Sequence, residues 1–321
     1  MLTFFRAAFS TQLWSAAVIY QFSGQASEQP THVYHYTTAD GLKGIIESKR
    51  LWASGAYFLN DTSEIEYGCE LTARILEESA VAPETEFIGK VLDKARSILM
   101  DPIQRETRTA TYYVACFCET DNLLSQWRTY GRQGGFAPGF RVADTRHLRS
   151  EPMTSTFGKV LYDKAEQLGL IHDLVIKVLS LLKRDDVVRG DASNLSGEDV
   201  SYAGQEVAQM LLWGTTFLKA PDFAEEHEWR LICQPRDVDD REKVRAAGQV
   251  ARFRTSSRGL IPYIELAWPQ GPDTIPTLPI DSVRFGPTQT HHMARTATRM
   301  FLDANGFQSV QVVGSGIPIN V

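Results

Sequence analysis

Strand-like and helix-like segments follow one another along this chain without a regular strand–helix–strand alternation. Short runs rich in β-branched and aromatic residues predict strands, and apolar residues at spacings of three and four predict helices. The predicted strands lie at about 33–37, 111–118, 136–140, 229–232, 260–266, 282–285 and 310–313. Because a doubly wound parallel sheet needs a helix between successive strands, we expect an α+β fold with a mixed, mostly antiparallel sheet and flanking helices.

We expect residues 31–321 to form a single domain, preceded by an N-terminal extension at residues 1–30. A long segment at about 145–222 has mainly helical periodicity, which predicts a largely helical insertion. The apolar groups of the first thirty residues are broken by polar ones and lack the continuous core of a secretory signal. No stretch approaches the roughly 20 apolar residues that span a bilayer, so we expect a cytoplasmic protein without stable membrane insertion.

The charge and the cysteine content limit the kinds of partner and of metal site that we expect. The formal net charge of −6 argues against non-specific coating of nucleic acid. Cys116 and Cys118 alternate along an apolar strand, so we expect them to fill core space. The chain offers no second pair of ligands at a suitable spacing, and we therefore expect no metal site.

One local segment is strongly basic. Five arginines stand between residues 128 and 149 against a single acid, Asp144. Arginine beside aromatic residues suits phosphate binding and base stacking, so Arg128, Arg132, Trp127 and Tyr130 are candidate contacts for phosphate or nucleic acid. A solvated charged face explains the same composition equally simply.

The most site-like feature is the segment Glu226-His227-Glu228-Trp229-Arg230. Alternate side chains of a strand share a face, so Glu226, Glu228 and Arg230 are expected to project together, opposite Trp229. Unpaired charge is costly to bury. Two interpretations follow: an exposed, salt-bridged strand edge, or a catalytic glutamate held by a neighbouring acid or arginine.

An early strand carries the second candidate group. Alternation places His35 and Thr37 on one face of this strand, with Tyr34 and Tyr36 on the other. The histidine is either a hydrogen-bonded core residue or a catalytic group. The tyrosines are either core or a stacking platform for a planar ligand.

Taken together, the segments resemble a bacterial family of domains of unknown function, from about Thr31 to Phe307. The residues that carry the resemblance are Tyr34-His35-Tyr36-Thr37, Gly41-Leu42, Ile45-Ile46, Phe58-Leu59-Asn60-Asp61, Glu64, Cys116-Phe117-Cys118-Glu119, Leu123-Leu124, Trp127, Tyr130-Gly131, Gly134-Gly135-Phe136, Gly139-Phe140, Lys219, Glu226 to Arg230, Ile261-Pro262-Tyr263 and Gly286-Pro287. Two positions depart from the pattern. Thr62 stands where a proline is usual, and Pro138 where an aliphatic residue is expected, which predicts a strand edge or a bulge.

The layout of these motifs is similar to that of ADP-ribosyltransferases, with an early His followed by Tyr-Thr, a middle aromatic residue and a late Glu-x-Glu. This resemblance implies NAD as a co-substrate. It implies that His35 contacts the NAD ribose, with Tyr36 and Thr37 beside it. It also implies that an aromatic residue, Tyr57 in preference to Trp52, stacks on the nicotinamide.

The same resemblance implies roles for the late strand. Glu228, with Glu226 beside it, would hold the reacting ribose hydroxyl, and Arg230 would belong to the cofactor site. A fixed carboxylate stabilises the oxocarbenium-like centre that forms when the nicotinamide bond breaks. We therefore predict that Glu228 faces a cleft shared with His35, while Trp229 points into the core.

Three functions follow as expectations. The first is an NAD-consuming enzyme, either a glycosyltransferase that transfers ADP-ribose to a protein or nucleic acid, or an NAD glycohydrolase. The resemblance implies a toxin or anti-phage effector with a cognate neutralising partner. The second is a non-catalytic sensor that binds nucleotide or nucleic acid through the basic segment. The third is a metal-dependent nuclease or phosphodiesterase, with Asp61, Glu64 and the late glutamates as Mg²⁺ ligands.

Overall fold

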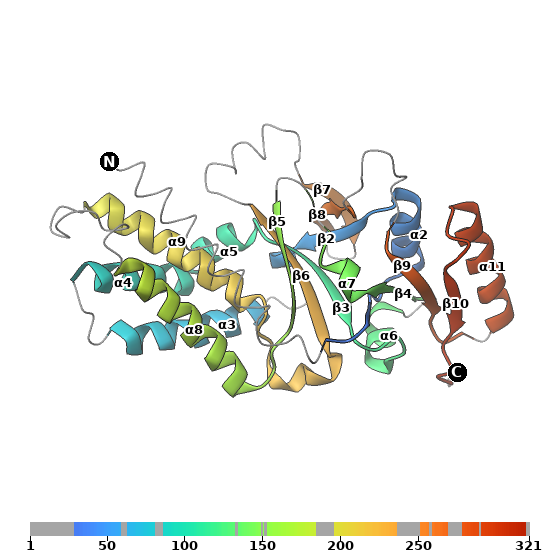
Figure 1. Ribbon diagram of the computed structural model, residues 1–321, viewed down its shortest axis with the longest axis horizontal. Coiled ribbons are helices and arrows are strands. Elements are labelled where there is room, and N and C mark those ends of the chain that lie inside the picture. The colour runs from blue at the N-terminus through green and yellow to red at the C-terminus, as the bar shows by residue number, and fades with distance from the viewer. Residues whose placement is uncertain are drawn as a thin grey trace.

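A computed structural model describes residues 29–58, 63–80, 86–131, 134–148, 150, 153–183, 196–235, 251–256, 259–268, 278–288 and 290–318. These residues form one ten-stranded sheet with helices packed on both faces (Figure 1). The α+β architecture and the mixed, mostly antiparallel sheet confirm the sequence prediction. The predicted N-terminal extension lies, up to residue 28, outside the described ranges.

The strands of the sheet are short and come from the whole length of the described chain. They are β1 (His32–Tyr34), β2 (Leu51–Gly55), β3 (Tyr113–Cys118), β4 (Phe136–Arg141), β5 (Met153–Lys159), β6 (Glu228–Pro235), β7 (Arg252–Ser256), β8 (Gly259–Leu266), β9 (Ile280–Phe285) and β10 (Gln311–Gly314). Their order is β10-β9-β4-β1-β3-β2-β8-β7, while β6 pairs with β3 and β5 pairs with β6. Among these pairs β9 and β10 run parallel, and the others run antiparallel.

Strand β3 is the point where three other strands meet. β1 pairs with its end at Cys118, β2 pairs with its beginning at Val114, and β6 pairs along its other side. Cys116 lies opposite Arg230, and Cys118 lies opposite Glu228. Both faces of β3 are covered by buried cores, which explains why its side chains are apolar.

A helical bundle covers one face of β3 and β6, which we call the bundle face. It contains α3 (Ser63–Ala80), α4 (Glu86–Met100), α5 (Pro102–Thr109), α8 (Lys164–Leu182) and α9 (Gly197–Thr215), gathered at one end of the molecule (Figure 1). Their apolar stripes pack with Val114 and Ile232 of the sheet into one buried core. Ser196 and Asp199 form a capping box that starts α9, and Asp163 caps α8.

The predicted helical segment at about 145–222 contains α8 and α9, but it also contains β5. This strand pairs with β6 from Met153 to Lys159. The segment is therefore joined to the sheet as well as to the bundle.

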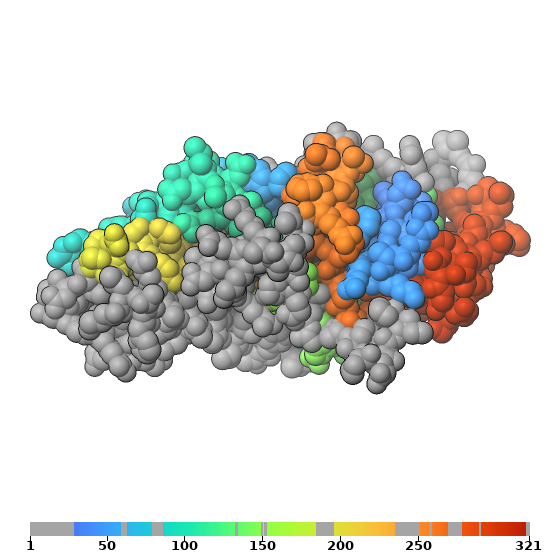
Figure 2. All heavy atoms as spheres, turned by 90° about the horizontal axis from the view of Figure 1, so that it is seen from above, coloured from blue at the N-terminus to red at the C-terminus, as the bar shows by residue number. Residues whose placement is uncertain are grey.

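The other face of the sheet, which we call the α2 face, packs a second core. It includes α2 (Ala39–Ser48) and α11 (His291–Ala304), with Trp229 and Phe117 from the sheet. Trp229 is 1% exposed, which confirms the prediction that it points into the core. Figure 2 shows α2 beside the β7–β8 hairpin, with α11 further along.

A smaller third core lies on the bundle face near β1 and β4. It holds Tyr36, Cys118, Trp127 and Ala137, and it is closed by α6 (Leu124–Tyr130). Between the sheet elements run η1 (Ala56–Phe58), α7 (Val142–Thr145) and η3 (Pro221–Glu226). None of the described helices combines the length and the apolar character needed to cross a membrane.

Pro138 lies in β4, which is paired on both sides, by β1 and by β9. The register of β4 against β9 shifts between Gly139 and Phe140, directly after the proline. The strand therefore accommodates Pro138 by a bulge rather than at a sheet edge, which was one of the two predicted outcomes.

Candidate functional site

Five charged side chains meet on the bundle face at the start of β6, and we call them the charged cluster: Glu64, Lys219, Glu226, Glu228 and Arg230. Glu228 and Arg230 lie on β6. One residue separates this strand from η3, which ends with Glu226. Glu64 comes from the first turn of α3, and Lys219 follows α9. The cluster thus joins the sheet to two helices of the bundle.

The ammonium group of Lys219 lies among three carboxylates. Its Nζ is 2.9 Å from Oε1 of Glu64, 2.5 Å from Oε2 of Glu226 and 3.2 Å from Oε2 of Glu228. Only 7% of the Lys219 side chain is exposed. Burial opposes the charge on this lysine, but Glu228 and Glu64 raise its pKa above its usual range.

The guanidinium of Arg230 binds two of these three carboxylates, those of Glu228 and Glu64. It donates to both oxygens of Glu228, from Nε at 2.8 Å and from Nη2 at 2.9 Å. Nη2 also lies 2.6 Å from Oε2 of Glu64, and Nη1 donates to the carbonyl oxygen of Thr216 at 2.7 Å. This network holds Glu228 in one orientation.

The two glutamates of the Glu-x-Glu motif have opposite pKa shifts. Burial alone would raise the pKa of Glu228, but Arg230 and Lys219 lower it to about 2. Burial raises the pKa of Glu226, and its ion pair with Lys219 offsets only part of this effect. Neighbouring carboxylates whose pKa values are moved apart are typical of sites that handle charge or protons during catalysis.

The three carboxylates of the cluster also differ in solvent exposure. The side chain of Glu226 is 24% exposed, against 8% for Glu228 and 11% for Glu64. A ligand at the surface therefore meets Glu226 first. The sequence alternation correctly placed Glu228 with Arg230, but Glu226 belongs to η3 and reaches the cluster through Lys219 instead.

Three more side chains border the cluster. The hydroxyl of Tyr162 accepts a hydrogen bond from the backbone N–H of Glu228 at 3.1 Å. The ring of Phe223 lies with its centroid 5.1 Å from Nζ of Lys219. Cys116 is beside Glu228, and burial raises the pKa of its thiol well above the usual range, so it stays protonated.

The structure does not bring His35 to the cluster. Its ring contacts Phe117 on the α2 face, with centroids 5.9 Å apart, whereas Glu228 lies on the bundle face opposite Cys118. Its Nδ1–H donates to the carbonyl oxygen of Cys116 at 2.8 Å. Burial lowers the pKa of His35, so the ring is neutral at neutral pH. The prediction that Glu228 and His35 share a cleft is therefore corrected: His35 lies with Phe117 on one face of the sheet, and Glu228 of β6 lies with Cys118 on the other.

Of the other residues predicted to contact NAD, Arg230 belongs to the charged cluster, whereas the contacts of Tyr36, Thr37 and Tyr57 are with residues outside it. Tyr36 is 6% exposed, and its hydroxyl donates to the carbonyl oxygen of Thr120. Thr37 pairs with Phe136 in an isolated bridge just before α2. Tyr57 lies in η1 and contacts the ring of its neighbour Phe58.

The aromatic residues of the basic segment are more buried than the prediction of a stacking surface requires. Trp127 is 3% exposed; its Nε1 donates to Asn122, and its ring packs edge-on against Tyr36 at 4.6 Å. Tyr130 packs against the same third core, while Arg128 is exposed on α6. Arg132 lies outside the described residues. Trp127 thus belongs to the core and is closed to stacking on a base, whereas Tyr130 is only partly buried.

The metal interpretation required Glu64 to approach the late glutamates, and it does. However, Lys219 and Arg230 occupy the space between these carboxylates. Within the described residues no group of His, Cys, Asp and Glu side chains has the arrangement of a metal site, and Asp61 lies outside these residues. The cluster is an ion-pair network rather than a set of open ligands.

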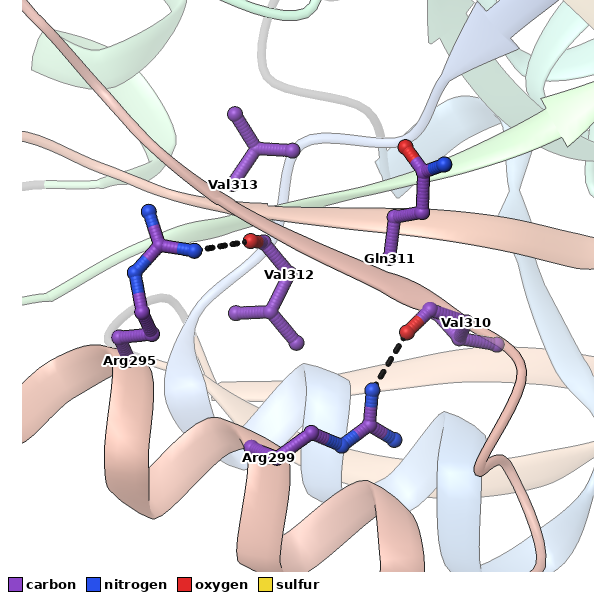
Figure 3. Close-up of a pocket in the computed structure, with 6 residues that line it drawn as sticks. All are labelled: Arg295, Arg299, Val310, Gln311, Val312 and Val313. Atoms are coloured by element: carbon purple, nitrogen blue, oxygen red, sulfur yellow. Dashed lines mark hydrogen bonds between the residues drawn. The ribbon is translucent and has the colours of Figure 1, made fainter.

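A groove of about 390 Å³ lies elsewhere, between α11 and β10. It is lined by Arg295, Arg299 and residues 310–313, and the two arginines donate to the backbone carbonyls of Val312 in β10 and of Val310 directly before it (Figure 3). Figure 1 places α11 and β10 at the opposite end of the molecule from the bundle. The groove is therefore separate from the charged cluster.

Sequence reasoning did not select Lys219 as a site residue, although it is the centre of the cluster. The available signal was a lysine directly after the apolar pair Phe217-Leu218, at a position where a buried side chain is expected. Buried lysines are rare unless paired, so a lysine buried at this position needs a carboxylate partner.

Comparison with known proteins finds a similarity to one family over part of the chain, and this family carries no assigned activity. Residues 126–231 match DUF2971, a protein of unknown function. The matched part runs from α6 into β6 and includes Lys219, Glu226, Glu228 and Arg230, whereas Glu64 lies before it. No curated protein and no solved structure matches the chain.

Proposed function

We propose that the charged cluster breaks the N-glycosidic bond of NAD and passes ADP-ribose to an acceptor or to water. The observation that carries this proposal is the pair of carboxylates, Glu226 and Glu228, whose pKa values are shifted in opposite directions around one buried lysine. Reactions at a glycosidic carbon pass through a centre with developing positive charge, and fixed carboxylates stabilise that charge.

Glu226 is the catalytic residue in this proposal, because it is the most exposed carboxylate of the cluster. Glu228 is a positioning residue: both of its oxygens are bound by Arg230, and one also lies near Lys219. His35 has no role at the reacting atoms, since it lies on the α2 face and binds a backbone carbonyl.

The reaction balances without a further reactant. The bond between the ribose C1′ and the nicotinamide nitrogen breaks, and its electron pair leaves with the nitrogen. A nucleophilic oxygen or nitrogen of the acceptor, or water, forms the new bond to C1′ and loses its proton to solvent. Ionised Glu226 stabilises the positive charge at C1′ between these events. The toxin or anti-phage setting is carried by the ADP-ribosyltransferase resemblance alone.

The test is release of nicotinamide from NAD by the purified chain, measured by chromatography with water, lysate proteins, RNA and DNA as acceptors. We expect Glu226→Gln to slow the release by about 100-fold or more, as loss of a charge-stabilising group does. Glu225→Gln is the matched control, because Glu225 is the exposed neighbour on η3 and should leave the rate unchanged. Equal rates for wild type and Glu226→Gln, or no nicotinamide release with any acceptor, would overturn the proposal.

A further inference from the structure

Phe223 and Glu226 lie on the same side of η3. A 3₁₀-helix has three residues per turn, so side chains three positions apart stand above one another. Both side chains also contact the same group: Nζ of Lys219 is 5.1 Å from the Phe223 ring centroid and 2.5 Å from the Glu226 carboxylate. An aromatic ring and a carboxylate therefore border one small area of surface.

The charges of the cluster do not balance. The cluster contains three carboxylates and two cations. When all five groups are ionised, these described side chains together carry one negative charge in excess. Glu64 and Glu228 each contact both cations. Among the described side chains of the cluster, Glu226 pairs with Lys219 alone. The excess charge therefore lies at Glu226, at the exposed rim. Burial is the main cause of the raised pKa of Glu226, and the nearby carboxylates of Glu228 and Glu64 also raise it.

We propose that Phe223 and Glu226 bind a positively charged planar group. The Phe223 side chain is 37% exposed, and an aromatic face attracts cations as well as stacking on flat rings. A cationic ring placed there supplies the missing positive charge of the cluster. A neutral ring of the same shape gains the stacking and lacks the charge pairing.

This inference rests on the proposed function for the identity of the ring. The nicotinamide ring of NAD is positively charged while it is bonded to ribose and neutral once it leaves. A site that selects the charged form holds the substrate ring more tightly than the released product. Phe223 then takes the stacking role that the resemblance assigned to Tyr57.

Two small probes test the inference without any bond being broken. We would titrate the full chain with the N-methylnicotinamide cation and with neutral nicotinamide, using calorimetry at neutral pH. We expect the cation to bind roughly tenfold more tightly, the effect of one added charge pair near a protein surface. Equal affinity for the two probes, or no saturable binding of either, would overturn the inference.

Variants separate the contribution of charge pairing with Glu226 from that of stacking on Phe223. Glu226→Gln should abolish the preference for the cation, while Glu225→Gln should keep it. Phe223→Ala should weaken both probes by a similar factor and preserve the preference. Circular dichroism of each variant establishes that it is folded. A preference that survives Glu226→Gln in a folded protein would contradict the assignment.

The two proposals fail in different ways. Selective binding of the cation without nicotinamide release from NAD would retain the binding site and refute the reaction. Nicotinamide release that depends on Glu226, without any preference between the probes, would retain the reaction and refute the cationic subsite.

Discussion

Glu228 owes its ionised state to two cations that are themselves buried. Its carboxylate would be destabilised by burial without Arg230 and Lys219, and each cation likewise depends on the carboxylates for compensation. Removing one member therefore leaves an unpaired charge inside the protein. We expect Glu228→Ala to lower the free energy of unfolding by about 3–5 kcal/mol, measured by urea denaturation at neutral pH. Loss of activity in that variant would report on folding as much as on chemistry.

The same residue makes a prediction about acid stability. A glutamate titrates near pH 4.3 in the unfolded chain, whereas the pKa of Glu228 is lowered to about 2 in the folded protein. Its contribution, about 3 kcal/mol, is complete above pH 4.3 and is lost as the pH falls through about 2. Urea denaturation between pH 5 and pH 2 should show a shallower loss of stability for Glu228→Gln than for wild type. Equal pH dependence in the two proteins would contradict the ion-pair assignment, and Glu225→Gln is the control.

At this scale the sequence predicted which residues share a face, but not which distant residues meet. Alternation placed Glu228 beside Arg230 and sent Trp229 into the core. The bond from Arg230 to Glu64 joins residues 166 positions apart, so no local pattern predicts it. The same limit explains the error with His35: only the pairing of β1 with β3, and of β3 with β6, decides on which face of the sheet each side chain lies.

At the scale of elements, the residue that follows η3 has an unusual backbone conformation. His227 has φ 42° and ψ 50°, the left-handed conformation that glycine adopts without strain. We expect His227→Gly to raise the free energy of unfolding by about 0.5–1 kcal/mol and His227→Val to lower it. Thermal and urea denaturation of both variants would measure this. A destabilising glycine would mean that the imidazole makes a contact worth more than the backbone strain.

The β10 edge of the sheet is protected by α11. Nη1 of Arg295 donates to the carbonyl oxygen of Val312 at 2.6 Å, and Nη1 of Arg299 donates to that of Val310 at 2.5 Å (Figure 3). Carbonyls on an outer strand otherwise invite pairing with another chain. We expect the double substitution Arg295→Ala and Arg299→Ala to cause concentration-dependent association, detected by light scattering after size-exclusion chromatography.

A control for the lost charges is available on other helices. Lys43→Ala with Lys90→Ala removes two exposed cations and should leave the protein in its wild-type state of association. Association in both double variants would attribute the effect to charge rather than to the strand edge.

The prediction of elements from the sequence was uneven: the strand at about 310–313 was predicted, whereas β5 was missed. Its sequence, Met153-Thr154-Ser155-Thr156, is as polar as a loop, and only pairing with β6 makes it a strand.

At the scale of the whole molecule, the charged cluster lies where the bundle meets the sheet. Glu64 belongs to α3, Lys219 follows α9, and Glu228 begins β6, so three parts of the chain must be in place before the charges are paired. The α+β class and the antiparallel sheet could be predicted from the order of strand-like and helix-like segments. The pairing of β3 with three strands could not be predicted, because the number of partners of a strand is not visible in its own sequence.

The pH dependence of nicotinamide release from NAD tests the central claim most directly, since it reports on the charge of Glu226 during the reaction. Ionised Glu226 is the active form in this account, and burial raises its pKa above the value near 4.3 of an ordinary glutamate. The rate should therefore rise with pH, with a midpoint above about 4.3, in both wild type and the Glu225→Gln control. A rate that falls as the pH rises through this range, or that is constant across it, would contradict the assignment of Glu226 as the catalytic carboxylate.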